Sequence, residues 1–249
     1  MTIASDYIGL QKQIADELGD RQDLLSPLSD SGITASPIQN AIQSAVAMWE
    51  REQFYFNQVY TQDAFTVVAG QEFYTSADYA PLATLAEIKK LRVKISNQRY
   101  YLRARTWEYV EDISVNPQTT ANPTDYAYFA ETLRFYPIPD GAYPITISGV
   151  ARGASLQSAD DANYWTEDAF DLIRSTAKLI LAQEVLHDPD LATECKIAIY
   201  GDPSLPQSRG YLMALNAETG RRTAKGRIRP TYFSLALAAA LAALLPHLV

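Results

Sequence analysis

The spacing of hydrophobic residues changes period twice along this chain, and these two changes constrain the fold more than any other feature. Up to residue 57 the apolar residues recur every three or four positions, which predicts helices. From Val59 to about residue 151 they alternate with polar residues, which predicts strands, and the helical spacing returns at Trp165. The sequence therefore predicts an α+β fold: a helical bundle with an inserted small antiparallel β-sheet unit and an extended C-terminal tail.

This pattern divides the 249 residues into four parts. We expect an N-terminal helical hairpin at 1–60 and an inserted antiparallel β unit of about six strands at 61–151. Further helices at 152–220 should complete the bundle, and residues 221–249 should form the tail. The tail is basic in its first half and rich in Ala and Leu in its second.

The helix predicted at 36–57 organises the N-terminal part, where it should pair with a helix at 5–18. Ser36 is a favourable N-cap, Pro37 suits the first helical position, and Gln39 completes a capping box. Large aromatic residues crowd the other end of this helix: Trp49, Phe54, Tyr55 and Phe56. We expect Trp49, Phe54 and Phe56 to anchor the helix where it meets the sheet.

A second pair of aromatic anchors begins the C-terminal helices. Thr166 is predicted to cap a helix at 169–186, and Trp165 is placed to pack on Phe170 as a hydrophobic staple. This helix is apolar around more than half of its circumference, so it should be the most buried one. The next two helices are predicted to start at Asp188-Pro189 and Asp202-Pro203 and to end at Gly201 and Gly220.

Charge is distributed unevenly. The net charge is −8, and the five basic and no acidic residues after Gly220 leave −13 for residues 1–220. Such an acidic body argues against a duplex-DNA reader, which needs a basic face. The basic segment is predicted to dock on an acidic protein partner, and its candidate docking residues are Arg221, Arg222, Lys225, Arg227, Arg229, Tyr232 and Phe233.

The last stretch, 234–249, is nearly all Ala and Leu and contains Pro246. Its 16 residues fall short of the roughly 20 that a membrane span needs. It is either a docking helix or material foreign to the natural protein, and we expect no membrane contact. The N-terminus has no basic region followed by an apolar one, so we expect no signal peptide and a protein made in a reducing cytoplasm.

Residues suited to catalysis or metal binding are few. The chain has two histidines, His187 and His247, and one cysteine, Cys195. His187 is expected to cap a helix C-terminus and Cys195 to be a buried structural thiol. None of the common nucleotide-binding, hydrolase or metalloprotease motifs occurs. We therefore predict no catalytic residue, no cofactor and no metal, and a protein that is not an enzyme.

Three segments, in their order along the chain, resemble a known family: WEREQFYFN at 49–57, FTVVAGQEFY at 65–74 and LRFYPIPD at 133–140. With the helical hairpin, the inserted sheet and the basic tail, they make residues 1–233 similar to the head-to-tail adaptor (connector) proteins of tailed bacteriophages. The resemblance implies a structural virion protein made in the host bacterial cytoplasm. It implies a homo-oligomeric ring, expected to be a dodecamer, at the head–tail junction.

The same resemblance implies the partners. Such a ring docks on the portal protein, extends the DNA channel and offers a platform to a downstream tail or nozzle protein. DNA passes through it without specific binding, and the C-terminal segment reaches into the portal. The alternative from another class is a carbohydrate- or receptor-binding module, with Tyr100, Tyr101 and Trp107 in a concave site. A nucleic-acid-binding protein is a second alternative, which the acidic body opposes.

Overall fold

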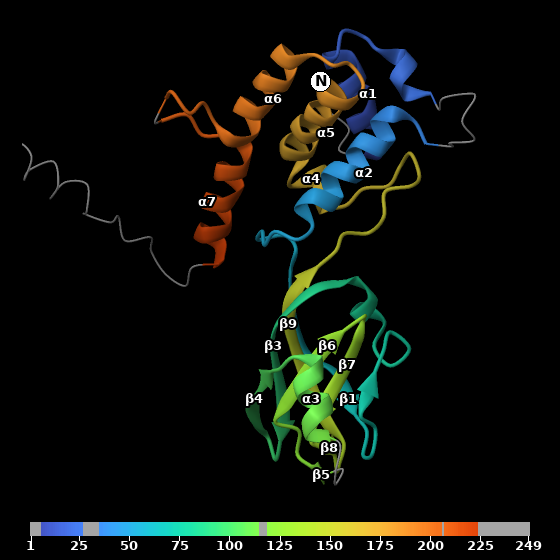
Figure 1. Cartoon of the computed structure of the whole chain (residues 1–249), viewed down its shortest axis with the longest axis vertical. Helices are drawn as coiled ribbons and strands as arrows, with labels where there is room; N and C mark the ends of the chain where they lie inside the picture. The colour runs from blue at the N-terminus through green and yellow to red at the C-terminus, as the bar shows by residue number, and fades with distance from the viewer. Residues whose placement is uncertain (1–5, 27–34, 115–118, 206, 224–249) are drawn as a thin grey trace, which may run out of the picture.

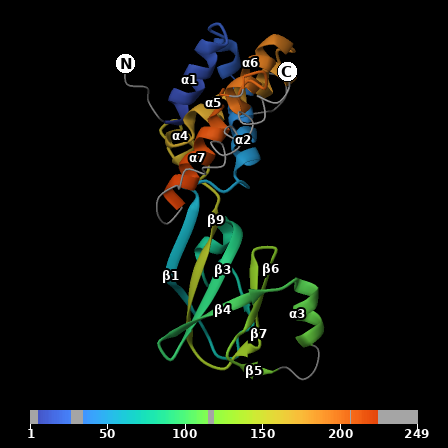
Figure 2. The same ribbon diagram turned by 90° about the vertical axis from the view of Figure 1, so that its left-hand side faces the viewer.

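The computed structural model describes residues 6–26, 35–114, 119–205 and 207–223. Helices gather at one end of the molecule and strands at the other (Figure 1). The helices are α1 (Tyr7–Glu17), α2 (Pro37–Trp49), α3 (Trp107–Ser114), α4 (Tyr164–Glu167), α5 (Phe170–Glu184), α6 (Pro189–Tyr200) and α7 (Tyr211–Thr223). Of these, only α3 lies with the strands (Figure 2). The predicted α+β class is confirmed.

The strands form one curled sheet of seven strands and a separate pair. They are β1 (Gln58–Val67), β2 (Phe73–Tyr74), β3 (Leu85–Ile95), β4 (Gln98–Ala104), β5 (Thr120–Ala121), β6 (Asp125–Phe129), β7 (Thr132–Tyr136), β8 (Ile138–Pro139) and β9 (Tyr143–Ala151). The order in the large sheet is β1-β9-β3-β4-β6-β7-β2.

The prediction of a purely antiparallel β unit is wrong at two places, because the short strands β5 and β8 pair in parallel and so do two strands of the large sheet. β4 and β6 pair in parallel, through Arg103 with Asp125 and Ala104 with Tyr126. The cause lies in the connection, because α3 stands between these two strands and carries the chain back before β6 begins. The sheet is therefore mixed.

Asp125 strengthens this short parallel pairing. Its carboxylate, only 5% exposed, lies 2.8 Å from both Arg103 Nη2 and Arg105 Nε. It also accepts a hydrogen bond of 2.6 Å from Thr124 Oγ1. Burial alone would raise the pKa of Asp125, but the hydrogen bonds from Thr124, Arg105 and Arg103 outweigh burial and lower it.

The two ends of the sheet meet through side chains. The Phe65 ring of β1 lies 5.5 Å from the Tyr74 ring of β2 and 6.4 Å from the Phe135 ring of β7. These residues belong to a core of the β unit that is distinct from the core between the helices. Each unit therefore buries its own apolar residues.

The start of α2 follows the sequence prediction and its end does not. Gln39 N donates to Ser36 Oγ at 3.1 Å and Ser36 N donates to Gln39 Oε1 at 2.9 Å, so the capping box forms. The helix ends at Trp49 rather than at Asn57. The buried Asn57 side chain accepts from Phe54 N (2.8 Å) and donates to Glu52 O (2.7 Å). These two hydrogen bonds pair backbone groups of the loop that leads the chain from α2 into β1.

Two of the C-terminal helices begin at other residues than the sequence predicts. Asn163, rather than Thr166, is the N-cap: it accepts from Trp165 N at 2.8 Å and caps α4, after which α5 begins at Phe170. Asp202 starts a turn instead of a helix, because its Oδ1 accepts from Ser204 N at 2.8 Å. The helix that follows starts at Tyr211 and continues through Gly220 to Thr223.

Other helix signals are confirmed. Asp188 caps α6 and Gly201, with φ of +92°, ends it. The helix α5 has more buried residues than any other helix of the described chain, and it packs against α1, α2, α6 and α7. Trp49 reaches α5 from α2 and donates a hydrogen bond of 3.0 Å from Nε1 to Thr176 Oγ1.

This contact generates a first prediction. Trp49 is 6% exposed, so Trp49→Ala should lower the free energy of unfolding by about 3–5 kcal/mol through the cavity that it leaves. Urea unfolding of the monomer measures this. Met48→Ala is the control, because Met48 is 52% exposed on the same helix and should change stability by at most about 0.5 kcal/mol. Unchanged stability of Trp49→Ala would contradict the assignment of Trp49 to the core.

The second prediction concerns pH. Asp125 has a lowered pKa in the folded protein, so its stabilisation is present above its unfolded pKa of about 3.9 and is lost as pH falls through the folded pKa. Asp125→Asn should lower the free energy of unfolding by about 1–3 kcal/mol at pH 7. This difference from wild type should shrink as the pH falls below about 4. The control is Asp112→Asn, an exposed residue of α3. A gap that stays constant down to pH 2 would contradict the ion-pair account.

Candidate interaction surfaces

The aromatic anchors expected from the sequence lie together in the helical core. Trp49, Phe54 and Trp165 are buried, and Phe56 and Phe170 pack against them. The sequence predicts the sheet as the partner of Trp49, whereas its hydrogen bond goes to α5. Trp49 therefore joins two helices, and other aromatic residues make the contact with the β unit.

These residues form an aromatic junction where the chain passes between the two units. The Phe56 ring lies 5.2 Å from both the Trp165 and the Tyr164 rings. Tyr164 OH donates to Ala151 O at the end of β9, at 3.0 Å. Burial, with the nearby Glu50 carboxylate, raises the pKa of Tyr164 to about 12, so this hydroxyl stays a donor at neutral pH. The junction holds the end of the sheet against α4.

The last turn of α7 is also attached to this junction. Arg221 and Arg222 both pair with Glu218, and the Arg222 guanidinium lies 3.9 Å above the Tyr55 ring. Tyr55 OH donates to Asp168 Oδ1 at 2.8 Å and Tyr55 N donates to Thr219 Oγ1 at 3.1 Å. The first two candidate docking residues are therefore helical, and Arg222 is held against the body. The others, Lys225, Arg227, Arg229, Tyr232 and Phe233, lie outside the described residues.

A second aromatic cluster lies on the β unit. Trp107 of α3 lies 6.0 Å from the Phe73 ring and 5.9 Å from the Phe129 ring. The Arg134 guanidinium is 5.1 Å from the Phe73 ring, and its Nε is 2.6 Å from Glu72 Oε1. Tyr101, in contrast, contacts Arg92. Within the described chain no ring contact joins Trp107 to Tyr100 or Tyr101, so these three residues do not form one aromatic cluster.

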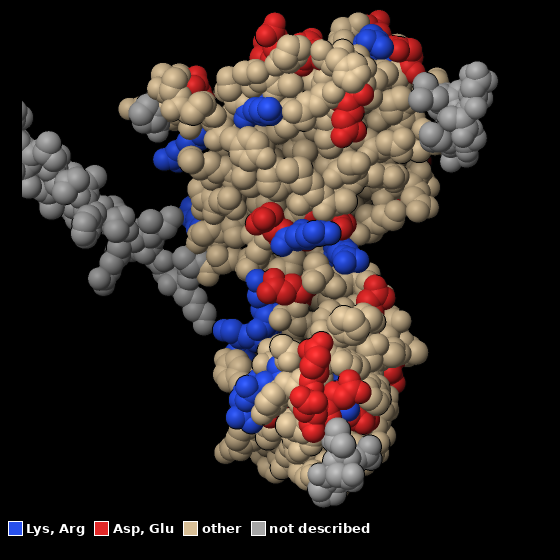
Figure 3. All heavy atoms as spheres, viewed as in Figure 1, with Lys and Arg blue, Asp and Glu red and all other residues tan. Residues whose placement is uncertain are grey.

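Sequence reasoning missed a basic face on the β unit. Seven Lys and Arg residues and no Asp or Glu lie between residues 88 and 105. In Figure 3 basic side chains gather along the margin of this unit where β3 and β4 lie, and acidic ones gather over α3. The signal was present in the sequence, but the net charge of the whole body concealed it.

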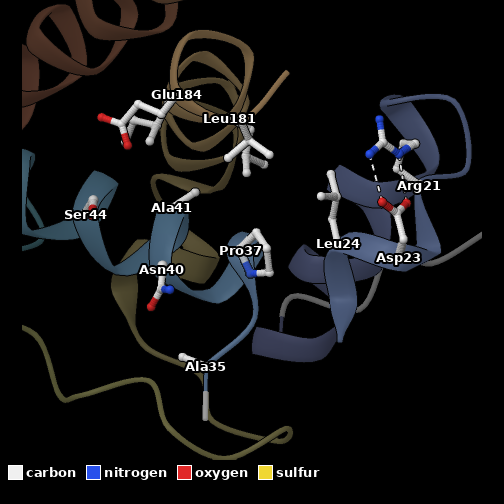
Figure 4. A pocket seen from close by; sticks show the side chains of 12 residues that line it. Arg21, Asp23, Leu24, Ala35, Pro37, Asn40, Ala41, Ser44, Leu181 and Glu184 are labelled. Carbon is white, nitrogen blue, oxygen red and sulfur yellow. Dashed lines mark hydrogen bonds and ion pairs between the residues drawn. The ribbon is translucent and has the colours of Figure 1, made fainter. Parts of the chain in front are cut away.

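The described part of the chain has several surface hollows. One of about 500 Å³ opens between α2, α5 and the segment after α1 and is lined by both apolar and polar residues. Figure 4 shows Asp23 beside it in an ion pair with Arg21, while Glu184 stands on the opposite side. Neither histidine nor cysteine lines it.

The remaining reactive groups have structural roles. The His187 ring lies 3.0 Å from Gln183 O, as expected of a residue at a helix C-terminus. Cys195 is buried and burial raises the pKa of its thiol. Across the described ranges there is no cluster of His, Cys, Asp and Glu suited to a metal ion. In the same ranges no helix is both long and apolar enough to cross a membrane.

Comparison with known proteins gives one family. A family model described as SU10 adaptor protein matches residues 5–229. The match covers both structural units and the basic residues up to Arg229, and it ends before the Ala/Leu-rich stretch. Among curated proteins no match is found.

The attachment of α7 generates a third prediction. Tyr55→Ala removes the ring beneath Arg222 and the donor to Asp168, so the last turn of α7 should open more often. A cation–π contact of about 1 kcal/mol corresponds to roughly fivefold faster amide exchange in residues 219–223. Hydrogen exchange measured by mass spectrometry tests this. Tyr60→Ala is the control, because Tyr60 is 57% exposed on β1. Equal exchange in both variants would contradict the attachment.

Proposed function

Because the chain belongs to the SU10 adaptor protein family, a family of phage head-to-tail adaptors, we propose that it forms the ring that joins head to tail. A phage structural adaptor of this family acts in the virion and interacts with portal and tail proteins. In our proposal the ring is a dodecamer that docks on the portal and extends the DNA channel. Its role is structural rather than enzymatic, and DNA passes through without sequence-specific binding.

The family match over nearly the whole chain carries this proposal, and the two-unit architecture supports it. The helical unit and the β unit have separate cores and lie at opposite ends of the molecule (Figure 1). An adaptor needs two such ends, one for each neighbour along the tail axis. We assign the helical parts, 1–60 and 152–220, to the portal side. We assign the inserted unit, 61–151, to the downstream tail or nozzle protein.

The tail, 221–249, is assigned to the portal. Its three basic residues beyond the described chain, Lys225, Arg227 and Arg229, complement an acidic partner. The contacts of Arg222 with Tyr55 and Glu218 place the start of this segment at the junction. Once the body is docked, binding of the tail becomes intramolecular, which raises the overall affinity without enlarging the body's own interface.

The experiment that tests this function compares three chains: full length, one ending at Phe233 and one ending at Thr223. The mass of each is measured alone and after mixing with purified portal, by light scattering. Full-length protein should form a defined complex, and the chain ending at Phe233 should do the same. The chain ending at Thr223 should keep its thermal stability, because α7 stays intact, and lose portal binding.

Each variant isolates one part of the proposal. If full-length protein forms no complex with portal, the adaptor function is wrong. If the chain ending at Thr223 binds portal as well as full length, the docking role of the tail is wrong and the ring function stands. If the chain ending at Phe233 fails to bind, the Ala/Leu-rich stretch carries the docking instead.

A further inference from the structure

One face of the β3–β4 hairpin concentrates positive charge. Along β3, Leu91 and Val93 are buried in the β unit, so Lys90, Arg92 and Lys94 project to the opposite side. The pairing register places Tyr101 of β4 beside Arg92 and Arg99 beside Lys94. The outward face therefore carries basic side chains on two adjacent strands.

Most of these cations are not neutralised within the chain. Among the described residues, Lys90, Lys94 and Arg99 form no ion pair, and the hydrogen bond of Arg92 (2.5 Å) goes to the Tyr101 hydroxyl. Neighbouring basic residues differ: Lys89 pairs with Glu87, and Arg103 pairs with Asp125. Like charges held together without counter-charges disfavour the isolated fold and attract an anionic partner.

The surrounding charge makes this face distinct. The body as a whole is acidic, with −13 over residues 1–220, and the acidic residues of α3 lie on another side of the β unit (Figure 3). A polyanion that approaches the β unit is thus attracted by the hairpin face and repelled by the acidic side over α3. The face is also rich in Lys, which protein–protein interfaces disfavour, whereas nucleic-acid backbones are commonly bound by Lys and Arg.

We propose that the outward face of β3–β4 binds the phosphate backbone of double-stranded DNA without reading its sequence. Neighbouring residues on one face of a strand are about 6.6–6.8 Å apart and adjacent strands about 4.8 Å apart, so Lys90 and Lys94 lie about 13 Å apart with Arg99 beside Lys94, and the three can contact phosphates along one stretch of backbone. The cation–π contact of 4.5 Å between Arg92 and the Tyr101 ring holds the centre of the face in place. This inference rests on the proposed function, which supplies DNA as the neighbouring polyanion.

The test uses two full-length triple variants with equal charge changes. The face variant is Lys90→Gln, Lys94→Gln, Arg99→Gln. The control variant is Lys12→Gln, Lys196→Gln, Arg209→Gln, which removes two lysines and one arginine that are exposed on the helical unit. Binding of a fluorescent DNA duplex is measured by anisotropy between 50 and 200 mM salt, with urea unfolding as a check of folding.

The face variant should weaken DNA binding by about tenfold or more and reduce the slope of log affinity against log salt by about 2–3, since each lost phosphate contact contributes about 0.9. The control variant should leave the slope unchanged. Equal slopes for wild type and face variant, or the same reduction in both variants, would overturn the inference. Loss of portal binding by the face variant with DNA binding intact would also overturn it and make the face a protein-docking surface.

Portal binding by the wild-type protein separates this inference from the proposed function. If wild type binds portal but the face variant keeps the wild-type salt slope, the adaptor function stands and the DNA-binding face is wrong. If wild type fails to bind portal, and the face variant but not the control variant shows a reduced salt slope, the adaptor function is wrong and the DNA-binding face is supported.

Discussion

The structure depends on the aromatic junction, because the chain passes between its two units only there. Ala151 N donates to Asn57 O at 2.9 Å, which pairs the entry to β1 with the exit from β9. The Tyr164 hydroxyl then donates to Ala151 O at the end of β9, and Phe56 packs on Tyr164 and Trp165. Since each unit has its own core, these few contacts determine how the units are oriented. The last turn of α7 is attached at the same place through Tyr55, so the tail also starts from the junction.

Local signals in the sequence predicted the local structure well. The capping box of Ser36 and Gln39 and the Asp188 cap formed as expected, because each requires only residues within one helical turn. The turn between β3 and β4 also depends on local residues: Ser96 and Asn97 adopt φ of 47° and 66°, which suits a two-residue hairpin. Such features are encoded by neighbours in the chain, so their recognition needs no knowledge of the fold.

Predictions that depended on distant residues failed. The early end of α2 depends on Asn57, whose side chain hydrogen-bonds the backbone of the loop after the helix. That loop leads into β1, which must begin beside β9, a strand far along the chain. The parallel pairing of β4 with β6 depends on where α3 returns the chain. The start of α7 at Tyr211 depends on Gly210, where a Cβ would lie 2.3 Å from Ile199 O. Trp49 is buried, but its hydrogen-bond partner is on α5 and not on the predicted sheet, and it lies 127 positions away in the sequence.

Charge, too, differs between the whole body and a single face of the protein, and this difference bears on function. A net charge summed over the body describes how the whole molecule repels a polyanion at long range, but this repulsion is screened beyond about 8 Å at physiological salt. At contact, the arrangement of individual side chains decides the interaction. The β3 alternation places Lys90, Arg92 and Lys94 on one side, and the hairpin register adds Arg99 from β4. An acidic protein can therefore repel a polyanion as a whole and still present a basic face that attracts it at contact.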